Sequence, residues 1–512
     1  MKMLHQGATT KIILPTELSR EIQVTFSFRQ GDPIAGDLYC ITLEPLLTML
    51  REKLVGLCFF NFVEKDTTYM DYTQILSEDE EDLVMFDHVM RQYEKQSGAM
   101  LSRNKKSLVM GLCQWQGKKD WPREVPWLQS VAQMKVLGLM VCPQYSDTVS
   151  QTWDMVLRGV QKTLFSWESR ALKTLQQRGK ALQTFALSKL WFAAQVLPLP
   201  TCMVKKFESA SSAFIFRGQP ERLKLSELQN PKEKGGLGLV CLATKAECLL
   251  LRQSLRILDQ PSSDSFLHLG HWLGFALQDT FPQLESCRHA LLPQYPLHKA
   301  MLEALEEGLI RDEFKPEKLE QVTTRSIYKG RATDMIPAPK IETKHAAVNF
   351  VELVYPRLCY VILEAEPKDI LYWLVHNIQP TRERMFEQHR VQNAACPHQE
   401  CLGKVQDRKH MFCSCSYLSP AWVWLRTKLM RYFSSTVGAR GISSEDFLLL
   451  CFPKDVMDKE IVWFIGNYCD IVVKQVLGKK KKLTANSVAA ILRSRLLSLQ
   501  TRRVVVPQIF NI

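Results

Sequence analysis

Four side chains in the C-terminal third of the chain have the types and the spacing of a zinc site. Four residues separate Cys396 from Cys401, four separate His410 from Cys415, and eight lie between the two pairs. Thiolates and imidazole suit borderline-soft Zn²⁺, and two short ligand pairs can close a small loop around the ion. The pattern predicts a closed, structural zinc site with Cys413 as an alternative to Cys415. The competing interpretation is a set of unrelated free thiols.

A second group, between residues 158 and 189, has the composition of a surface that binds polyanions. It carries seven basic side chains against one acidic side chain, Glu168. Cations bind phosphates in a salt-dependent way, and exposed aromatic rings can stack on bases. The predicted nucleic-acid contacts are Arg158, Lys162, Arg170, Lys173, Arg178 and Lys180, and the interleaved aromatic residues are Trp153, Phe165 and Trp167. We favour a core position for the tryptophans, and nucleic-acid contact over a solvated helix face for the cations.

A short string near the N-terminus fits a strand-to-helix turn. Arg29, Gln30 and Gly31 precede Asp32 and Pro33, and proline suits the first turn of a helix. The Arg29 and Gln30 side chains could then face a nucleic-acid groove. On its own, the string favours an ordinary strand–turn–helix junction.

An ordered series of motifs that includes this string resembles the reverse transcriptases of non-LTR (LINE-type) retrotransposons. Residues 28–46 resemble the template-contacting motif of the palm, and Tyr69-Met70-Asp71-Tyr72 stands where the family has Tyr-Ala-Asp-Asp. Further matches lie at 97–99 with Asn104, Lys106 and Ser107, at 136–138, at Trp167 and Arg170, and at 178–181, 197–200, 214–218, Pro231 and 235–239. The cysteine and histidine cluster, with the preceding residues 371–374, resembles the C-terminal zinc-binding region of the same polyproteins. The order of the matches indicates descent from such a polyprotein.

The resemblance also implies what polymerisation would need. The family holds two Mg²⁺ ions with three aspartates, one on an upstream palm strand and two adjacent in the Tyr-Ala-Asp-Asp hairpin. Here Asp71 is a remnant of that pair, and the neutral phenol of Tyr72 takes the second place. The palm strand with the first aspartate would precede Met1. We therefore expect no polymerase activity from this chain, and Mg²⁺ binding only if such activity is retained. By resemblance, Arg29, Gln30, Gly31 and Lys106 would contact nucleic acid.

Periodic apolar residues predict the elements that would position these motifs. Alternation over 22–28 predicts a strand, helical spacing over 34–54 predicts a helix, and 57–63 with 67–75 predicts a β-hairpin that turns near 64–66. The acidic run 78–82 is expected to be the solvated start of a helix that ends near Gly98. Apolar stripes predict further helices over 148–166, 177–197, 201–216 and 240–258.

The expected fold class is α+β, mostly α. It comprises a partial reverse-transcriptase palm of short antiparallel strands plus helices, an α-helical thumb, and a helical C-terminal region with a small zinc knuckle. The expected domains are a truncated palm over 1–145, a thumb-like domain over 146–260, a linker or helical middle region over 261–345, a zinc-binding region over 346–425 and a C-terminal helical region over 426–512. A missing palm strand would leave an unpaired edge, so residues 1–110 should be the least stable part unless a partner chain covers it.

The overall composition favours several folded domains and a polyanionic partner. A length of 512 residues suggests about two to four domains. The net charge of +13 and pI of 9.0 favour RNA or DNA as the partner. No signal peptide or membrane span is recognised, and 15 cysteines then point to a reducing compartment. We expect nuclear or cytoplasmic localisation, not secretion, and no membrane partner. The lysines at 479–482 are a nuclear-import signal or a solvated helix end.

Three functional hypotheses remain. The preferred one is a reverse-transcriptase-derived pseudoenzyme with residual RNA or DNA binding through the thumb and the zinc knuckle. The second is an RNA-directed DNA polymerase completed by an N-terminal part or a partner chain. The third is a structural or interaction protein that does not bind nucleic acid.

Overall fold

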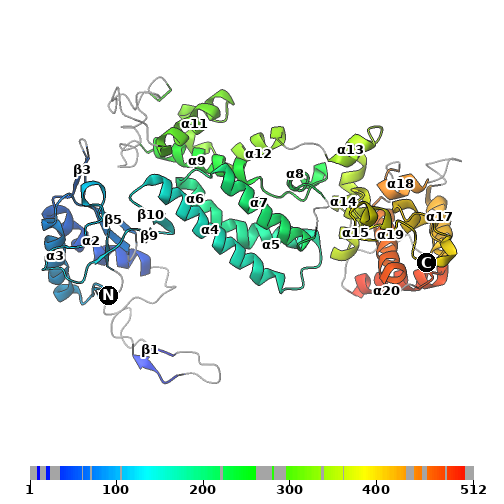
Figure 1. Ribbon diagram of the computed structural model, residues 1–512, viewed down its shortest axis with the longest axis horizontal. Helices are drawn as coiled ribbons and strands as arrows, with labels where there is room; N and C mark the ends of the chain where they lie inside the picture. The colour runs from blue at the N-terminus through cyan, green and yellow to red at the C-terminus, as the bar shows by residue number, and fades with distance from the viewer. Residues whose placement is uncertain are drawn as a thin grey trace. The chain divides into compact units, whose positions relative to one another are not determined.

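The described part of the chain is mostly helical, and its strands form short two-stranded sheets (Figure 1). The computed structural model describes residues 9–11, 19–23, 35–59, 62–69, 72–103, 107–219, 223–260, 280–281, 296–335, 339–360, 363–433, 443–452, 458–478 and 481–501. The chain divides into an N-terminal unit, Met1–Thr148, and a C-terminal unit, Val149–Ile512. The five predicted domains, with their four boundaries, stay predictions.

In the N-terminal unit, pairs of short strands accompany two long helices. The antiparallel pairs are β1 (Thr9–Thr10) with β2 (Ile22–Gln23), β3 (Leu57–Phe59) with β4 (Phe62–Glu64), β5 (Asp66–Tyr69) with β6 (Tyr72–Ile75), and β9 (Met134–Val136) with β10 (Leu139–Val141). The parallel pair is β7 (Leu108–Val109) with β8 (Gln129–Ser130), and the 3-10 turn η1 (Cys113–Trp115) lies between these two strands in sequence. The long helices are α2 (Ala35–Lys53) and α3 (Glu81–Ser97).

Helices α2 and α3 form the core of the N-terminal unit. Leu46 and Leu50 of α2, with Leu54 directly after the helix, recur at helical spacing and pack against Val89 and Met90 of α3. The backbone N–H of Gly98 donates to Glu94 at the end of α3, where a φ of 74° favours glycine. Both predicted helices are therefore confirmed.

Two local predictions in this unit were wrong. Residues 57–75 form two separate hairpins, because an alternating pattern defines which face is apolar and does not define where the chain reverses. Asp66, placed in the predicted turn, begins β5 and accepts a 3.0 Å hydrogen bond from Arg51. In the acidic run, Glu78, Asp79 and Glu81 are exposed at the start of α3 as predicted, but Asp82 is buried. Its carboxylate accepts the N–H groups of Val55 and Gly56 at 2.8 Å each.

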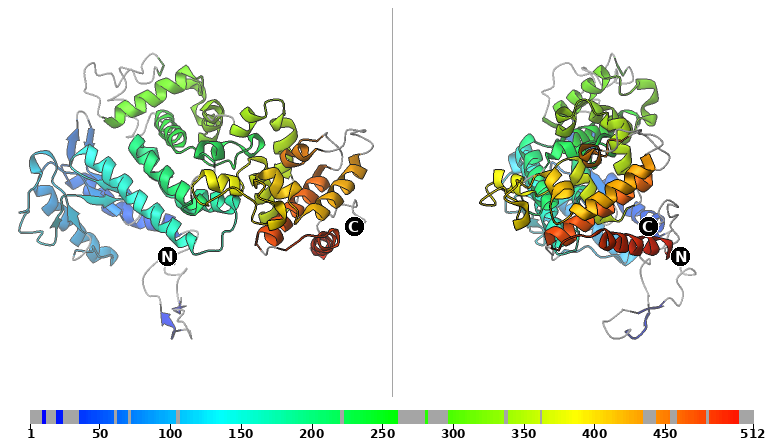
Figure 2. Two further views of the ribbon diagram at one scale, coloured as in Figure 1. Left: turned by 45° about the vertical axis from the view of Figure 1, so that its right-hand side comes forward. Right: turned by 90° about the vertical axis from the view of Figure 1, so that its right-hand side faces the viewer.

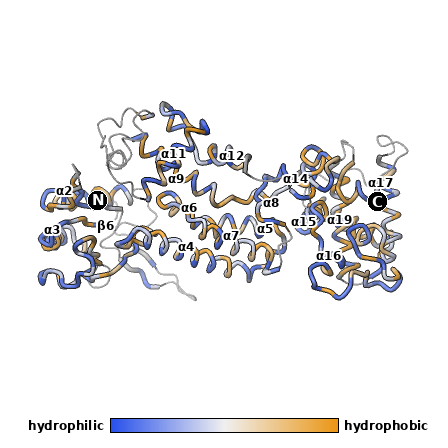
Figure 3. The backbone as a smooth tube through the Cα atoms, turned by 45° about the horizontal axis from the view of Figure 1, so that its top comes forward, coloured by the Kyte–Doolittle hydropathy of each residue, from blue (hydrophilic) through white to orange (hydrophobic). Residues whose placement is uncertain are grey.

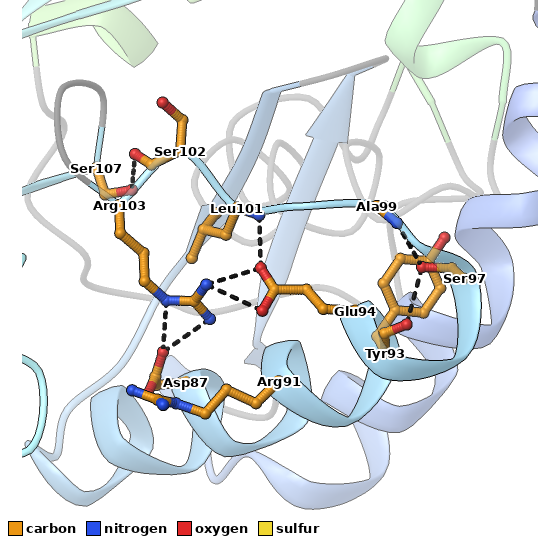
Figure 4. A network of polar contacts seen from close by, with 10 residues as sticks. All are labelled: Asp87, Arg91, Tyr93, Glu94, Ser97, Ala99, Leu101, Ser102, Arg103 and Ser107. Carbon is orange, nitrogen blue, oxygen red and sulfur yellow. Dashed lines mark hydrogen bonds and ion pairs between the residues drawn. The ribbon is translucent and has the colours of Figure 1, made fainter. Parts of the chain in front are cut away.

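A polar network fixes the segment after α3 (Figure 4). The Arg103 guanidinium donates to Glu94 at 2.7 and 2.9 Å and to Asp87 at 3.1 Å. The Leu101 N–H also donates to Glu94, at 2.6 Å. Burial opposes ionisation of Glu94, but these hydrogen bonds prevail and keep its pKa below the ordinary value. The segment that resembles the family's post-hairpin motif is thus anchored to α3.

The first part of the C-terminal unit is a set of packed helices. They are α4 (Tyr145–Glu168), whose start belongs to the N-terminal unit, α5 (Leu175–Ala181), the π turn η2 (Leu182–Ala186), the 3-10 turn η3 (Leu187–Lys189), α6 (Leu190–Val196), α7 (Thr201–Phe216), α8 (Leu225–Gln229), η4 (Lys232–Lys234) and α9 (Leu242–Leu258). In Figure 3 apolar and polar stretches alternate along α4 and α7, as expected of helices with one buried face. The four predicted helical segments are confirmed.

Helix α4 runs antiparallel to the segment from η2 to α6. Trp153 near its start donates from Nε1 to the Pro198 carbonyl at 2.9 Å, whereas Trp167 near its end stacks on Phe185 with ring centroids 4.5 Å apart. Trp153 is fully buried, and its ring is nearly perpendicular to that of Phe207, with centroids 6.2 Å apart. It is therefore a core residue, as predicted.

A second core joins α9 to the helices that follow it. These are α11 (Pro296–Ile310), η6 (Pro316–Gln321) and α12 (Thr324–Met335). Leu251 and Leu255 of α9 pack with Leu305 and Phe314. Arg331 of α12 is buried beside this core and donates to both carboxylate oxygens of Glu313, at 2.8 and 2.7 Å. Residues from both sides of the predicted boundary at 260/261 thus share one core.

The remaining helices follow α12 and run from yellow-green to red in Figure 2; among them, α15 packs against α19. They are α13 (Lys340–Lys344), η7 (Phe350–Val354), α14 (Tyr355–Tyr360), α15 (Ala365–Val375), α16 (Arg382–Glu387), η8 (Gln399–Cys401), η9 (His410–Ser414), α17 (Ser419–Phe433), α18 (Ser444–Leu449), α19 (Asp458–Val472), η11 (Val473–Gly478) and α20 (Ala485–Thr501).

Helix α15 also contacts the start of α5. The Asp369 carboxylate accepts the Leu175 N–H at 3.0 Å. Glu366 pairs with Lys474 at 2.6 Å and with Lys173 at 2.9 Å, and hydrogen bonds from these two lysines lower the pKa of Glu366 to about 2. The helices that resemble a thumb and the C-terminal helices are therefore packed within one unit.

Candidate metal centre and basic helical surface

The metal cluster stands on a small hairpin and a π turn. An isolated bridge pairs Ala395 with Val405, and the N–H of Cys396 donates to Lys404 at 2.8 Å. Cys401 ends η8, and Leu402 and Gly403 follow with φ angles of 49° and 74°, which turn the chain back. The second pair of cluster residues, His410 and Cys415, lies on and directly after the π turn η9, which begins at His410. The N–H of His410 donates to the Asp407 carboxylate at 2.6 Å.

These elements bring together the four predicted ligands. The ligand atoms of Cys396, Cys401, His410 and Cys415 lie within 4.8 Å of one another, and all four residues are buried. The sulfurs of Cys401 and Cys415 are 3.7 Å apart. This agrees with the separation of about 3.8 Å between two sulfurs that bind one tetrahedral zinc ion through Zn–S bonds of about 2.3 Å. The His410 Nε2 is buried without a hydrogen-bond partner among the residues that the structure describes. The donor set therefore fits a closed metal site.

The protonation chemistry of the cluster also suits a cation. Burial raises the pKa of Cys396, and raises that of Cys415 to about 12. For Cys401, burial is outweighed by hydrogen bonds from Ser416, and its pKa falls below the ordinary value. Burial lowers the pKa of His410, which favours the neutral imidazole that ligates metals. A divalent cation would supply the positive charge that stabilises the thiolate forms of these cysteines.

Cys413, the alternative ligand, lies outside the cluster. It is buried, and its pKa is raised to about 12, mainly by burial, while a hydrogen bond with Ser444 opposes the shift. The neighbouring carbonyl of Phe412 accepts the Tyr468 hydroxyl of α19 at 3.1 Å. Cys415, and not Cys413, completes the set in this geometry.

Aromatic and basic side chains flank the cluster. The His398 ring stacks on Tyr417 with centroids 3.8 Å apart. Lys482 lies 5.5 Å from the centre of the Tyr417 ring and pairs with Glu400 at 2.5 Å. The N–H of Leu483 donates to the Tyr417 carbonyl at 2.8 Å. The end of the lysine run is therefore held against the metal cluster; Lys479 and Lys480 lie outside the described residues.

The predicted nucleic-acid contacts of the basic helical segment differ in their environment. Arg158, Lys162 and Lys180 are exposed. Arg170 is exposed and lies over the Trp167 ring, 4.2 Å from its centre. Lys173 is paired with Glu366 of α15. Arg178 is only 7% exposed and donates to the Thr174 carbonyl at 3.3 Å, so its guanidinium group is engaged inside the protein.

Three exposed residues in the opposing segment were not singled out as contacts from the sequence. Phe185, Lys189 and Phe192 are spaced i, i+4 and i+7. Arg158, Lys162 and Phe165 have the same spacing on α4. This repeat of basic and aromatic residues could have identified Phe185, Lys189 and Phe192 as candidate contacts from the sequence.

Several predicted residues of the palm lie outside the described part of the chain. They are Arg29, Gln30, Gly31, Asp71 and Lys106. Tyr72, which follows Asp71, starts β6 opposite Tyr69 and is 56% exposed.

No helix in the described ranges combines the length and the apolar character that a membrane crossing requires.

Comparison with known proteins connects the chain to a mobile element. No family model matches it. Over 269 residues it is 25% identical to the "Transposon TX1 uncharacterized 149 kDa protein" of Xenopus laevis. The chain is a distant relative of this transposon-encoded protein. The match covers 50% of the present chain and 20% of the relative, so the chain spans about a fifth of the relative's length.

Proposed function

We propose that this protein derives from the reverse-transcriptase region of a non-LTR retrotransposon polyprotein and now binds RNA or DNA without polymerising it. The relationship to a transposon-encoded protein supports the origin. The ordered motifs between residues 28 and 239 supply the finer assignment to a palm followed by a thumb, because this order is typical of such reverse transcriptases.

One observation carries the binding function: the basic segment keeps exposed cations on adjacent helices. Arg158, Lys162, Lys180 and Lys189 are exposed, and Glu168 is the single acidic residue between 158 and 189. A surface of this kind binds phosphates by releasing counterions, so its affinity should fall with salt. Lys173 and Arg178 are left out of the proposed surface because they are engaged within the fold.

A salt titration of RNA binding tests the proposal. The double variant R158A/K162A should bind more weakly to every sequence and reduce the slope of log affinity against log salt by about one to two, because two phosphate contacts are lost. A matched control, K299A/R311A, removes Lys299 of α11 and Arg311 directly after this helix, which pair with Glu303 and Glu307 of α11. Equal binding by the protein and both variants would count against the basic segment as the binding surface. No binding by the unaltered protein would favour the interaction hypothesis without nucleic acid.

The absence of polymerisation is proposed from the residue types at positions 71 and 72. A phenol at Tyr72 replaces a carboxylate, and Mg²⁺ needs hard oxygen ligands of near-octahedral geometry. Primer extension on an RNA template with Mg²⁺ or Mn²⁺ should give no product. Product that disappears in the D71A variant would favour the polymerase hypothesis instead.

The cysteine and histidine cluster is proposed to hold a structural Zn²⁺. Cys396, Cys401, His410 and Cys415 would all be used as ligands, so no position stays open for substrate. When bound, the ion would cross-link the 395–405 hairpin to η9. Gln406 supports the site by donating from its amide to the Cys396 sulfur at 3.9 Å.

A further inference from the structure

Helix α4 presents cations and an aromatic ring on one exposed face. Arg158, Lys162 and Phe165 are separated by four and three residues, so they share this face. Phe165 is 77% exposed, although a phenylalanine of a helix usually packs against a neighbour. The three residues span about 10 Å along the helix axis.

The segment antiparallel to α4 adds a second row of the same composition. Phe185 and Phe192 are 47% and 53% exposed, and Lys189 is exposed between them. The Lys189 Cδ lies 3.8 Å from the position that a Cβ would take at Gly159. Gly159 follows Arg158 directly and precedes Lys162 by one turn. Lys189 therefore brings the second row to the edge of the first; we call the six residues of both rows the basic–aromatic face.

The electrostatics of this face favour an anionic partner. The nearby carboxylate of Asp154 is paired with Lys206 at 3.6 Å, which offsets its charge. The cations of the face are therefore available to bind phosphates. Its phenylalanines are uncharged and would contact a different kind of group. A partner that uses both kinds of side chain must present phosphates and apolar, planar groups together.

Single-stranded nucleic acid meets this requirement better than a duplex does. In a duplex the faces of the bases stack on one another, so protruding rings meet only groove edges and sugars. An unpaired strand exposes its base faces, on which aromatic side chains stack regardless of sequence. A purely electrostatic duplex surface would need the cations but not the phenylalanines.

We infer that the basic–aromatic face binds single-stranded nucleic acid. Lys162 and Lys189 contact the phosphates, and Phe165 and Phe192 stack on unpaired bases. This inference rests on the proposed nucleic-acid binding and narrows it to one class of substrate.

Fluorescence anisotropy with the full-length, zinc-loaded protein tests the inference. One probe is a labelled mixed-sequence RNA strand, and the second is the same strand annealed to its complement. The protein should prefer the single strand. The variant F165A/F192A should lose affinity for the single strand by about fivefold or more for each ring that stacks on a base, while its affinity for the duplex stays nearly unchanged.

Two control variants separate stacking from charge. Phe386→Ala removes an exposed phenylalanine of α16 outside the face and should leave both affinities unchanged. Lys162→Ala should weaken both probes. Equal affinity for the two probes, or single-strand binding that F165A/F192A leaves intact, would overturn the inference while nucleic-acid binding stands. Failure to bind either probe would overturn both.

Discussion

At the residue scale, the metal cluster shows how a spacing pattern becomes a chemical site. Fourteen positions separate Cys401 from Cys415, yet their sulfurs lie 3.7 Å apart because the turn at Leu402 and Gly403 reverses the chain. Cys413 is closer in sequence to His410 than Cys415 is, but it interacts with Ser444 instead. The identity of the fourth ligand therefore depends on the π turn that starts at His410.

The choice between the two cysteines can be tested by metal analysis. Cys415→Ser should abolish stoichiometric zinc binding, because three ligands no longer close the tetrahedron. Cys413→Ser is the matched control, and it should retain zinc because its sulfur lies outside the cluster. Zinc content after dialysis, measured by mass spectrometry, reads out both variants. Retention of zinc by Cys415→Ser and its loss by Cys413→Ser would reverse the assignment.

His376 makes stability depend on pH. Burial lowers its pKa from 6.5 to about 4, and its ring lies against Tyr372, with centroids 4.4 Å apart. Because the folded pKa is depressed, the unfolded chain takes up the proton first as the pH falls. The contribution to stability is complete above about pH 6.5 and is lost between pH 6.5 and 4, by about 3 kcal/mol.

Urea unfolding at pH 7 and pH 5 measures this effect. His376→Leu should flatten the pH dependence even if the variant is less stable at both values. His345→Leu, which alters a less buried histidine, should retain it. Any loss of bound zinc at low pH would be shared by the unaltered protein and both histidine variants, so it would cancel in the comparison. An unchanged pH dependence in His376→Leu would contradict the prediction.

At the element scale, the metal-binding hairpin and the segment before α20 support each other. Glu400 precedes the ligand Cys401 and pairs with Lys482, and Tyr417 follows the ligand Cys415 and accepts the Leu483 N–H. Elements distant in sequence are thus held together through residues next to the ligands. A change in the cluster should be transmitted to the lysine run.

Chelation should therefore release Lys482 from its contacts beside the cluster. Removing zinc is expected to accelerate trypsin cleavage after Lys482, because Glu400 and Tyr417 lose their fixed positions. Peptide mapping by mass spectrometry follows this cleavage against that after Lys299 on α11, which should not change. Glu400→Gln should accelerate cleavage after Lys482 with zinc still bound. Identical cleavage with and without chelator would refute the coupling.

At the whole-molecule scale, the two units differ in what stabilises them. The described core of the N-terminal unit consists of one face each of α2 and α3, and its strands form two-stranded sheets with unpaired edges. Such sheets have little independent stability. The C-terminal unit buries several helices in shared cores, including α9 with α11. This contrast agrees with the expectation that residues 1–110 are the least stable part, which stays a prediction.

Limited proteolysis of the full chain tests the expected order of stability. The first cuts should fall within Met1–Thr148, leaving Val149–Ile512 as a resistant product that keeps its zinc. Intact-mass analysis over time identifies the products. Early cuts within α5 to α9, with the N-terminal unit still intact, would contradict this prediction. Protection of the N-terminal unit by an added partner would agree with a covered strand edge.

Several helices and the residue types of the metal site could be predicted from the sequence. Apolar spacing located α2, α3, α4 and α7, because helical periodicity is a local property of the chain. The two hairpins within residues 57–75 and the burial of Asp82 could not be predicted, because both depend on where neighbouring segments lie in the folded chain. The same is true of the cations: the exposure of Lys162, the pairing of Lys173 and the burial of Arg178 are set by residues far away in sequence, such as Glu366 on α15. The sequence shows which side chains are charged. Whether a charged side chain can contact a partner depends on the groups from distant parts of the chain that the fold places beside it.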